Sequence, residues 1–374
     1  MIDVEKYREE FPVTKNYVYL NHAGHSPACK RVYEAVVKCA DKLMESGDYT
    51  VNVRKTKSAF AKLVGAKIDE IAVVTNTTTG LNTIMHMLEV RSGKNIVTND
   101  LEYPSNVYPW LKMKSKGIEV RYVKNVNGKI PIEAYEKAID DNTLAVSISH
   151  VIWTNGFKHN LKELADIAHK HGAYLIVDAI QSAGAVKVNV KEMDIDFMSC
   201  GTYKWLLGPT GAGYLYIREE YIDKFTPPYV GYAGVKYKED PIEFDLYKLE
   251  WRESAEKFEL GTMSHFSFAG AQAAIELILE VGIENIEARI MKLTRYLTEK
   301  LLEKGFKLQS PIDDKERGGI VNFKLKNGNE ICKKLKEEKV ITSFRAGGLR
   351  VSPHFYNTKE EIDLFIEKLQ KLTK

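Results

Sequence analysis

The chain has 374 residues, of which 44% are hydrophobic and 28% are charged, and its formal net charge at pH 7 is +3. This length exceeds what one simple hydrophobic core usually serves, so we expect two domains that share an interface. The composition is that of a soluble globular protein, and the charges form no dense basic cluster. We therefore expect no nucleic-acid partner, while a small anionic ligand stays open.

The sequence predicts neither a membrane segment nor a metal site. No apolar run approaches the ~20 residues needed to span a bilayer, and residues 1–6 lack the apolar core of a signal peptide. The cysteines, at positions 29, 39, 200 and 332, form no Cys-x-x-Cys pair, which argues against structural zinc and a disulfide framework. We expect a cytoplasmic protein.

Predicted strands and helices alternate through the first two thirds of the chain. Residues 1–17 are polar and are expected to form an arm, and a short strand at 17–20 leads into the loop 21–27. Helical patterns follow at 30–45, 53–63 and 161–169. Further strands are expected at 71–75, 95–98, 118–123, 144–149, 174–177, 197–199 and 212–217. This alternation predicts an α/β fold with a largely parallel sheet covered by helices.

From residue 227 to 257 the composition changes to Pro, Tyr, Gly and charge without a clear period. This predicts a long surface or active-site segment and a domain junction. Helices are then expected at 269–279 and 283–302, strands at 320–323, 340–344 and 349–351, and a last helix after the capping box 358–361. The predicted organisation is an arm, 1–17, packed on the small domain, a large domain, 18–257, and a smaller C-terminal α+β domain, 258–374.

Asp178 ends the apolar strand 173–177, and ligands of open α/β sheets gather at such strand ends. Alone, it is equally well explained as a helix cap or a loop residue. Gln181 follows one turn later, and Lys204 lies downstream beside the turn Gly-Pro-Thr-Gly at 208–211. This layout is typical of proteins that hold pyridoxal phosphate (PLP). Asp178 keeps the pyridine nitrogen protonated there, and Gln181 donates to the phenolate oxygen.

Lys204 is the residue on which this interpretation depends most. Most of the 54 Lys and Arg side chains are expected to be solvated surface charges. Lys204 instead precedes Trp205, Leu206 and Leu207, and apolar surroundings lower the pKa of a lysine, as imine formation with the cofactor aldehyde requires. Once substrate displaces it, the free amine can move a proton between the substrate carbon and the cofactor.

Residues 76–82, Asn-Thr-Thr-Thr-Gly-Leu-Asn, follow a predicted strand and open a helix. Hydroxyls and free backbone N–H groups at a helix N-terminus suit a phosphate, although an ordinary threonine N-cap explains the segment equally well. The chain lacks Gly-x-Gly-x-x-Gly after its early strands and lacks Gly-x-x-x-x-Gly-Lys-Ser/Thr. Nicotinamide dinucleotides and ATP are therefore poorly supported.

Three further segments hold candidate residues. Tyr103 follows another strand and is either a turn residue or a ring that stacks on a planar cofactor. Arg350 lies in an apolar strand and needs a carboxylate, either a structural one or the substrate's, and Arg345 is a weaker second candidate. Residues 259–262, Glu-Leu-Gly-Thr, precede a long helix and by themselves read as a helix cap.

Together these segments resemble the class V aminotransferase family of PLP enzymes, which includes cysteine desulfurases, kynureninase and isopenicillin-N-epimerase-like proteins. The resemblance runs from Tyr19 to Thr358 and is most specific at 177–182, at 203–204 and at 208–211. It implies PLP fold type I, with a mainly parallel seven-stranded sheet and a smaller C-terminal α+β domain. It also implies a homodimer with active sites at the subunit interface.

The resemblance assigns the central roles by position. Lys204 matches the Schiff-base lysine, Asp178 the partner of the pyridine nitrogen and Gln181 the donor to the phenolate oxygen. Arg350 matches the arginine that binds the substrate α-carboxylate.

The resemblance also assigns contacts to the rest of the cofactor. Thr77 and Thr78 match phosphate ligands, and Tyr103 takes the place of the ring that stacks on the cofactor. Tyr203 precedes the lysine as in kynureninase-like members, where that tyrosine approaches the phosphate. Thr262 matches a threonine that reaches the phosphate of the neighbouring subunit.

Two features depart from the desulfurases. Those enzymes carry a nucleophilic cysteine between the positions of Arg345 and Arg350, whereas residues 346–349 here are Ala-Gly-Gly-Leu. A desulfurase that forms a persulfide is therefore disfavoured. An ungapped alignment also places Trp153 where desulfurases have an asparagine beside the cofactor, so the substrate side of the pocket differs.

We expect a PLP-dependent enzyme that acts on a small amino acid, with an aminotransferase favoured and a 2-oxo acid as its acceptor. A C–S lyase or an amino-acid epimerase is the alternative, because all three begin with loss of the α-proton. A second alternative is a non-catalytic relative that keeps the fold as a scaffold. The joint retention of Lys204, Asp178, Gln181 and Arg350 argues against it.

Overall fold

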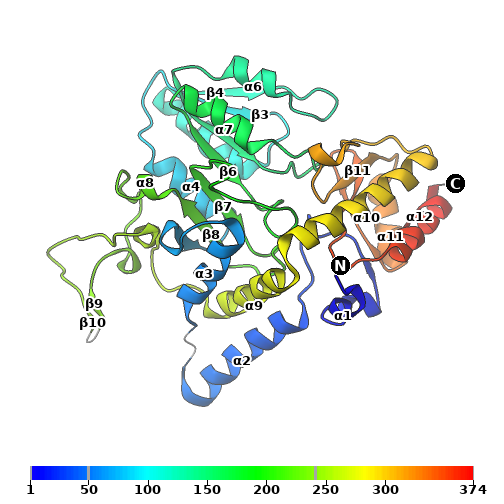
Figure 1. Cartoon of the computed structure of the whole chain (residues 1–374), viewed down its shortest axis with the longest axis horizontal. Coiled ribbons are helices and arrows are strands. Elements are labelled where there is room, and N and C mark those ends of the chain that lie inside the picture. The colour runs from blue at the N-terminus through cyan, green and yellow to red at the C-terminus, as the bar shows by residue number, and fades with distance from the viewer. Residues whose placement is uncertain (1, 49–50, 240–241, 374) are drawn as a thin grey trace.

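A seven-stranded sheet lies at the centre of the computed structural model, which describes residues 2–48, 51–239 and 242–373 (Figure 1). The strand order is β2-β8-β7-β6-β5-β3-β4. In that order the strands are Ile71–Val74, Gly213–Ile217, Phe197–Gly201, Tyr174–Asp178, Thr143–Ser149, Asn95–Asn99 and Glu119–Val123. β8 runs against its neighbours β2 and β7, and the other pairings are parallel. The predicted mainly parallel sheet is confirmed.

Helices cover both faces of this sheet, because successive side chains along a strand point to opposite sides. Ile71 and Val73 of β2 belong to a core cluster with side chains of α3, α7 and α9, whereas Ala72 and Val74 pack with side chains of α4 and α5. The helices of this part are α2 Lys30–Ser46, α3 Val53–Val64, α4 Thr77–Met87, α5 Tyr108–Lys112, α6 Ile132–Ala138, α7 Leu161–Lys170, α8 Glu219–Ile222 and α9 His265–Val281.

A second, C-terminal unit follows the long helix α10, Ile283–Glu303, which leads away from the sheet (Figure 1). Its three-stranded antiparallel sheet has the order β11-β14-β13. Its elements are β11 Val321–Lys324, α11 Gly328–Glu337, β12 Val340–Ile341, β13 Ser343–Arg345, β14 Gly348–Val351 and α12 Lys359–Thr373. A separate hydrophobic cluster holds this unit together, and it includes Leu293, Phe323 and Phe365.

The single strand expected at 340–344 is wrong, because the chain forms two strands there. β12 pairs in parallel with β1, Val18–Tyr19, and β13 pairs with β14 on the far side of Thr342. The apolar pattern of five residues does not encode this change of partner. The predicted domain boundary at 257/258 stays a prediction, and the packing favours a later one. α9 belongs to the cluster of the large sheet, and the C-terminal cluster begins within α10.

The N-terminal residues lie against the C-terminal unit. They include a short helix, α1, Val4–Arg8, whose Arg8 donates to Glu361 of α12 at 3.1 Å. The ring of Phe11 stacks on Tyr356 with a centroid distance of 3.7 Å. These contacts support the predicted arm.

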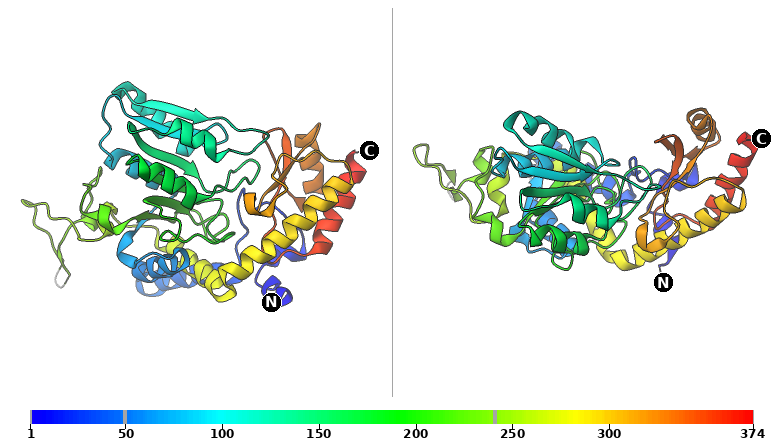
Figure 2. Two further views of the ribbon diagram at one scale, coloured as in Figure 1. Left: turned by 45° about the horizontal axis from the view of Figure 1, so that its top comes forward. Right: turned by 90° about the horizontal axis from the view of Figure 1, so that it is seen from above.

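The segment 227–257 extends away from the body of the molecule (Figures 1 and 2). It contains the short pair β9, Lys238–Glu239, and β10, Ile242–Glu243, and residues 240 and 241 lie outside the described residues. Leu246 and Tyr247 beyond the pair are 87% and 101% exposed. The part of the segment around β9 and β10 is therefore a surface segment with little core contact, whereas Ala255 near its end is buried in the core.

Among the helices that the structure describes, none by itself is long and apolar enough to cross a membrane. α9 and α10 pass that test of length and composition only when taken together across an 80° bend.

Candidate active site

Asp178 and Lys204 lie at the same edge of the sheet. Asp178 is the last residue of β6, where it pairs with Ser199 of the parallel neighbour β7. β7 ends at Gly201, and Lys204 follows three residues later. Because parallel strands end at one edge, the alternation of strands and helices is what brings these two residues together.

Lys204 is a buried amine in aromatic surroundings. Its side chain is 8% exposed, and its Nζ atom lies 5.6 Å from the ring centroids of both Tyr103 and Tyr203. Burial lowers the pKa of Lys204, the Arg350 charge lowers it further, and the Asp178 carboxylate opposes the change. The amine therefore holds its proton less tightly than a surface lysine, which favours nucleophilic attack on an aldehyde.

Asp178 is a buried carboxylate that accepts a hydrogen bond from the backbone. The backbone N–H of Ile180 donates to its Oδ1 at 2.9 Å. Burial raises the pKa of Asp178, and this hydrogen bond and the Lys204 charge oppose the change. A protonated pyridine nitrogen supplies the cation that such a carboxylate needs. The residue thus fits the role of partner to the ring nitrogen of PLP.

The Gln181 side chain is fixed at both ends of its amide. Trp205 Nε1 donates to Gln181 Oε1 at 2.8 Å, and Gln181 Nε2 donates to the Ala23 carbonyl at 3.0 Å. An indole nitrogen only donates and a carbonyl only accepts, so the orientation of the amide is determined. These two bonds leave the second N–H of Gln181 for another acceptor.

The two candidate phosphate ligands lie at the N-terminus of α4, with their hydroxyls in different directions. The buried Thr77 accepts a hydrogen bond from the backbone N–H of Gly201 at 2.8 Å, which ties it to the end of β7. Thr78 Oγ1 lies 2.8 Å from Ser105 Oγ. Asn76 caps the helix by accepting from the Thr79 N–H at 2.9 Å. The N-terminus of α4 therefore lies beside the end of β7, three residues before Lys204. Its contact with a phosphate stays a prediction.

Arg350 is a buried cation on β14 whose hydrogen bonds go to neutral groups. Its Nε donates to Ser343 Oγ at 3.1 Å and its Nη1 to the Trp153 carbonyl at 2.7 Å. Within the described parts of the chain, no carboxylate lies within ion-pair distance of it. Burial lowers the pKa of Arg350 to about 9. Arg345 by contrast is exposed and bonds the carbonyl of Phe344.

Tyr103 and Trp153 form an aromatic wall beside the lysine. Their rings meet edge to face with a centroid distance of 5.4 Å. Tyr103 is 40% exposed, so one side of its ring is open to a ligand, as stacking on a planar cofactor requires. Trp153 thus contributes its ring to this wall and its carbonyl to Arg350.

Thr262 lies in a different loop from the residues described above, shortly before α9. Its hydroxyl is 2.6 Å from the Tyr232 hydroxyl, and it lines a separate groove of about 630 Å³ with Tyr232 and Tyr237. The structure therefore does not bring Thr262 to the site of its own subunit. Its contact with the phosphate of a neighbouring subunit stays a prediction.

Two loops that the sequence did not assign to the site hold the Lys204 segment. Ser26 in the N-terminal loop donates its hydroxyl to the Lys204 carbonyl at 2.6 Å, and its N–H to the Tyr203 carbonyl at 3.0 Å. His354 Nε2 lies 3.1 Å from the Trp205 carbonyl. For the contacts of Ser26, the polar loop 21–27 after a short strand was the available signal in the sequence. No local sequence pattern indicates the contact of His354.

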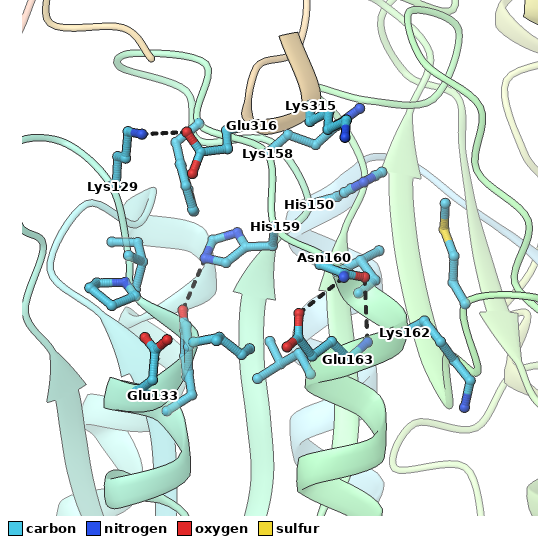
Figure 3. Close-up of a pocket in the computed structure, with 18 of the residues that line it drawn as sticks. Lys129, Glu133, His150, Lys158, His159, Asn160, Lys162, Glu163, Lys315 and Glu316 are labelled. Atoms are coloured by element: carbon cyan, nitrogen blue, oxygen red, sulfur yellow. Dashed lines mark hydrogen bonds and ion pairs between the residues drawn. The ribbon is translucent and has the colours of Figure 1, made fainter. Parts of the chain in front are cut away.

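A large groove of about 1090 Å³ lies elsewhere, at the N-terminal end of α7 (Figure 3). Lys204 and Asp178 do not line it. Its lysines are matched by carboxylates, as in the contact of Lys129 with Glu316 and the 3.7 Å pair of Lys158 with Glu287. This balance of charge gives the groove no preference for an anionic cofactor.

A sequence model described as Aminotransferase class-V matches residues 18–365 of the chain. The protein belongs to this family. It is 30% identical over 373 residues to the uncharacterized aminotransferase YcbU of Bacillus subtilis, covering 99% of this chain and 98% of that protein. It is also 30% identical over 400 residues to a probable cysteine desulfurase of Pyrococcus abyssi, again covering 99% and 98%.

A solved structure agrees over the whole length. The apo cysteine desulfurase from Thermococcus onnurineus NA1 superposes with a TM-score of 0.91 at 28% identity, covering 100% of this chain and 98% of that one. The resemblance seen in the sequence, the α/β fold of PLP fold type I and PLP as the cofactor are thereby confirmed. The relatives include both aminotransferases and desulfurases, so they do not separate the two reactions.

Replacing Asp178 by Asn is expected to lower the pKa of Lys204 further, because the carboxylate opposes the effect of burial on that amine. In cofactor-free protein, modification of Lys204 by an amine-reactive probe should rise with pH through a midpoint below the ordinary lysine value of about 10.4. In the Asn variant this midpoint should lie lower still. Mass spectrometry of the Lys204 peptide over a pH series measures both midpoints.

The exposed Lys62 in the same digests reports the response of the reagent itself. A midpoint for Lys204 that is unchanged or higher in the Asn variant contradicts the assigned coupling.

Proposed function

We propose that the protein transfers the amino group of a small α-amino acid to a 2-oxo acid. The observation that carries the choice of an amino acid as substrate is the buried Arg350, which lacks a carboxylate among the described residues and whose charge acts on Lys204. Transfer is preferred among the reactions of an amino acid because residues 346–349 lack the cysteine of a persulfide route. A buried cation in this position favours a bound anion. An amino acid brings a carboxylate for Arg350 and an amine that takes the place of Lys204.

PLP, when bound, supplies a ring that accepts the electrons of the substrate Cα–H bond. Burial lowers the pKa of the Lys204 amine. We propose that its Nζ takes the α-proton of the substrate and passes it to a carbon of the cofactor. Asp178 keeps a proton on the ring nitrogen, and Arg350 holds the carboxylate through its planar fork. Tyr103 and Trp153 form a wall on one side of the site.

A C–S lyase is the second candidate, because the Pyrococcus and Thermococcus relatives are named as desulfurases. A route through an enzyme persulfide is not supported by the thiols of this chain. Residues 346–349 contain no cysteine, and Cys29, Cys39 and Cys200 are buried. Cys332 in α11 lies 3.5 Å from the Thr342 carbonyl. The lyase candidate is therefore one that cleaves the substrate without a cysteine nucleophile. An epimerase is a further alternative, because it shares the first step, loss of the α-proton.

We also propose a cytoplasmic homodimer in which Thr262 contacts the cofactor phosphate of the partner subunit. The position of Thr262 supports this, since it lies on an exposed loop away from the lysine of its own subunit. A non-catalytic scaffold is the least supported function. Such a protein has no need for a buried lysine, a buried aspartate and a buried arginine in one site.

A panel of amino acids mixed with the yellow, PLP-loaded enzyme tests the reaction type. Transfer predicts conversion of the cofactor to its pyridoxamine form with release of the 2-oxo acid that corresponds to the amino acid supplied, and without release of sulfide or ammonia. Release of sulfide or pyruvate without pyridoxamine assigns a C–S lyase, and inversion at the α-carbon alone assigns an epimerase. An unchanged spectrum with every amino acid contradicts all three and favours the scaffold.

Replacing Arg350 by Gln is expected to weaken binding of amino acids about 100-fold, because a charge-assisted pair in a buried site is lost. The matching amines, which lack the carboxylate, should bind the variant and the wild type alike. Titration of the yellow band with each ligand gives the dissociation constants.

Arg345→Gln is the matched control, and its exposed side chain predicts a change of less than about threefold. An equal loss of affinity for amino acids and for amines in Arg350→Gln would assign Arg350 a structural role instead.

A further inference from the structure

Trp205 belongs to a chain of hydrogen bonds whose direction is determined at every member. The backbone N–H of Phe355 donates to His354 Nδ1 at 2.9 Å, so the hydrogen of the neutral ring is on Nε2. That nitrogen donates to the Trp205 carbonyl at 3.1 Å. Burial lowers the pKa of His354 to about 4, which keeps the ring neutral at physiological pH. The loop after β14 thereby holds the backbone of Trp205.

The indole ring itself has little freedom to move. Trp205 is fully buried, with the His354 ring 5.6 Å and the His22 ring 6.0 Å from it. A Cβ atom on Gly319 would lie 2.5 Å from the indole Cη2, and one on Gly184 would lie 2.2 Å from the Trp205 carbonyl oxygen. Backbone therefore packs closely on the ring and on its carbonyl, and the direction of the Nε1–H bond is fixed.

This rigid donor determines where the Gln181 amide lies. The Gln181 oxygen accepts from Trp205 Nε1–H, and one N–H of the amide donates to the Ala23 carbonyl. The other N–H of the amide is therefore available to a ligand. Without the indole donor, Gln181 Oε1 is a buried acceptor without a partner, which is costly. The side chain then rotates to find another donor, and its NH₂ group leaves its present position.

We propose that Trp205 is a positioning residue that holds Gln181 so that its second N–H donates to the phenolate oxygen of PLP. The inference rests on the proposed function and on the role of donor to that oxygen that the family resemblance gives Gln181. A donor at this oxygen stabilises the negative charge of the oxygen. The nitrogen of Lys204 that is bonded to the cofactor then loses its proton more easily, because its proton is held partly by that charge. Loss of the donor therefore raises the pH at which the yellow band of the loaded enzyme titrates.

The test compares that pH midpoint in four variants of the PLP-loaded enzyme. Gln181→Leu is expected to raise it by about one pH unit, the value of one hydrogen bond to a charged group. Trp205→Phe, which keeps an aromatic ring but removes the donor, should produce at least half of that shift. The double variant should match Gln181→Leu, because both changes act through one amide.

Trp110→Phe is the matched control, since Trp110 is equally buried but lies in the cluster on the opposite face of the sheet. Its midpoint should equal that of the wild type. A wild-type midpoint in Trp205→Phe, together with a shifted one in Gln181→Leu, would falsify the proposal. Presence of the yellow band in all variants separates this outcome from a failure of the Lys204 assignment, in which no variant is yellow.

A second measurement does not require Trp205→Phe to fold. The chain has four tryptophans, and their indole N–H groups give separate nuclear magnetic resonance signals in protein labelled with ¹⁵N-tryptophan. In Gln181→Leu, one of these signals should move upfield, because the Trp205 indole loses its acceptor. Four unchanged signals contradict the bond on which the proposal depends.

Discussion

Lys204 and Asp178 are buried together where β6 and β7 end, and burial acts against the charged form of each. Burial alone would favour a neutral amine and a neutral acid. Their mutual attraction opposes this effect and favours the charged form of each group. The rest of the structure serves to place other groups around this pair.

Three distant parts of the chain converge on the Lys204 segment. The N-terminal loop contributes Ser26, the loop after β14 contributes His354, and β6 contributes Asp178. The seven-stranded sheet and the C-terminal unit are thus joined at the reactive lysine as well as through α10. This arrangement explains why Arg350, which belongs to the C-terminal sheet, can act on a site built by the large sheet.

The sequence carried enough information to predict the fold and the central pair. Strands and helices alternate with clear periods, and Asp178 and Lys204 each stand next to a strand end, so local patterns were sufficient. The hydrogen bonds of Trp205 and His354 depend on tertiary packing, which no local pattern encodes. The break between β12 and β13 has the same cause. The family resemblance assigns Thr77, Thr78 and Thr262 to the phosphate of the cofactor. These contacts stay predictions, because they involve a bound molecule or a second subunit rather than residues of one chain.

The reaction type depends on what lies around the shared machinery. In the proposed function, transfer, elimination and epimerisation all use Lys204 to hold the proton and Arg350 to hold the carboxylate. They differ in the carbon to which the proton is returned and in whether a β-substituent of the substrate leaves. The family resemblance places Trp153 where desulfurases have an asparagine, which stays a prediction. The loop 346–349 also lacks the thiol of a persulfide route. The second feature disfavours a reaction that passes through a persulfide of the enzyme.

In the proposed function, one buried amine, the Nζ of Lys204, bonds covalently to PLP. This bond can be tested by reducing the loaded wild-type enzyme with borohydride, digesting it and sequencing the cofactor-labelled peptide by mass spectrometry. We expect one labelled peptide, modified at Lys204. A label on any other lysine, or an enzyme that binds PLP without a reducible bond, contradicts it.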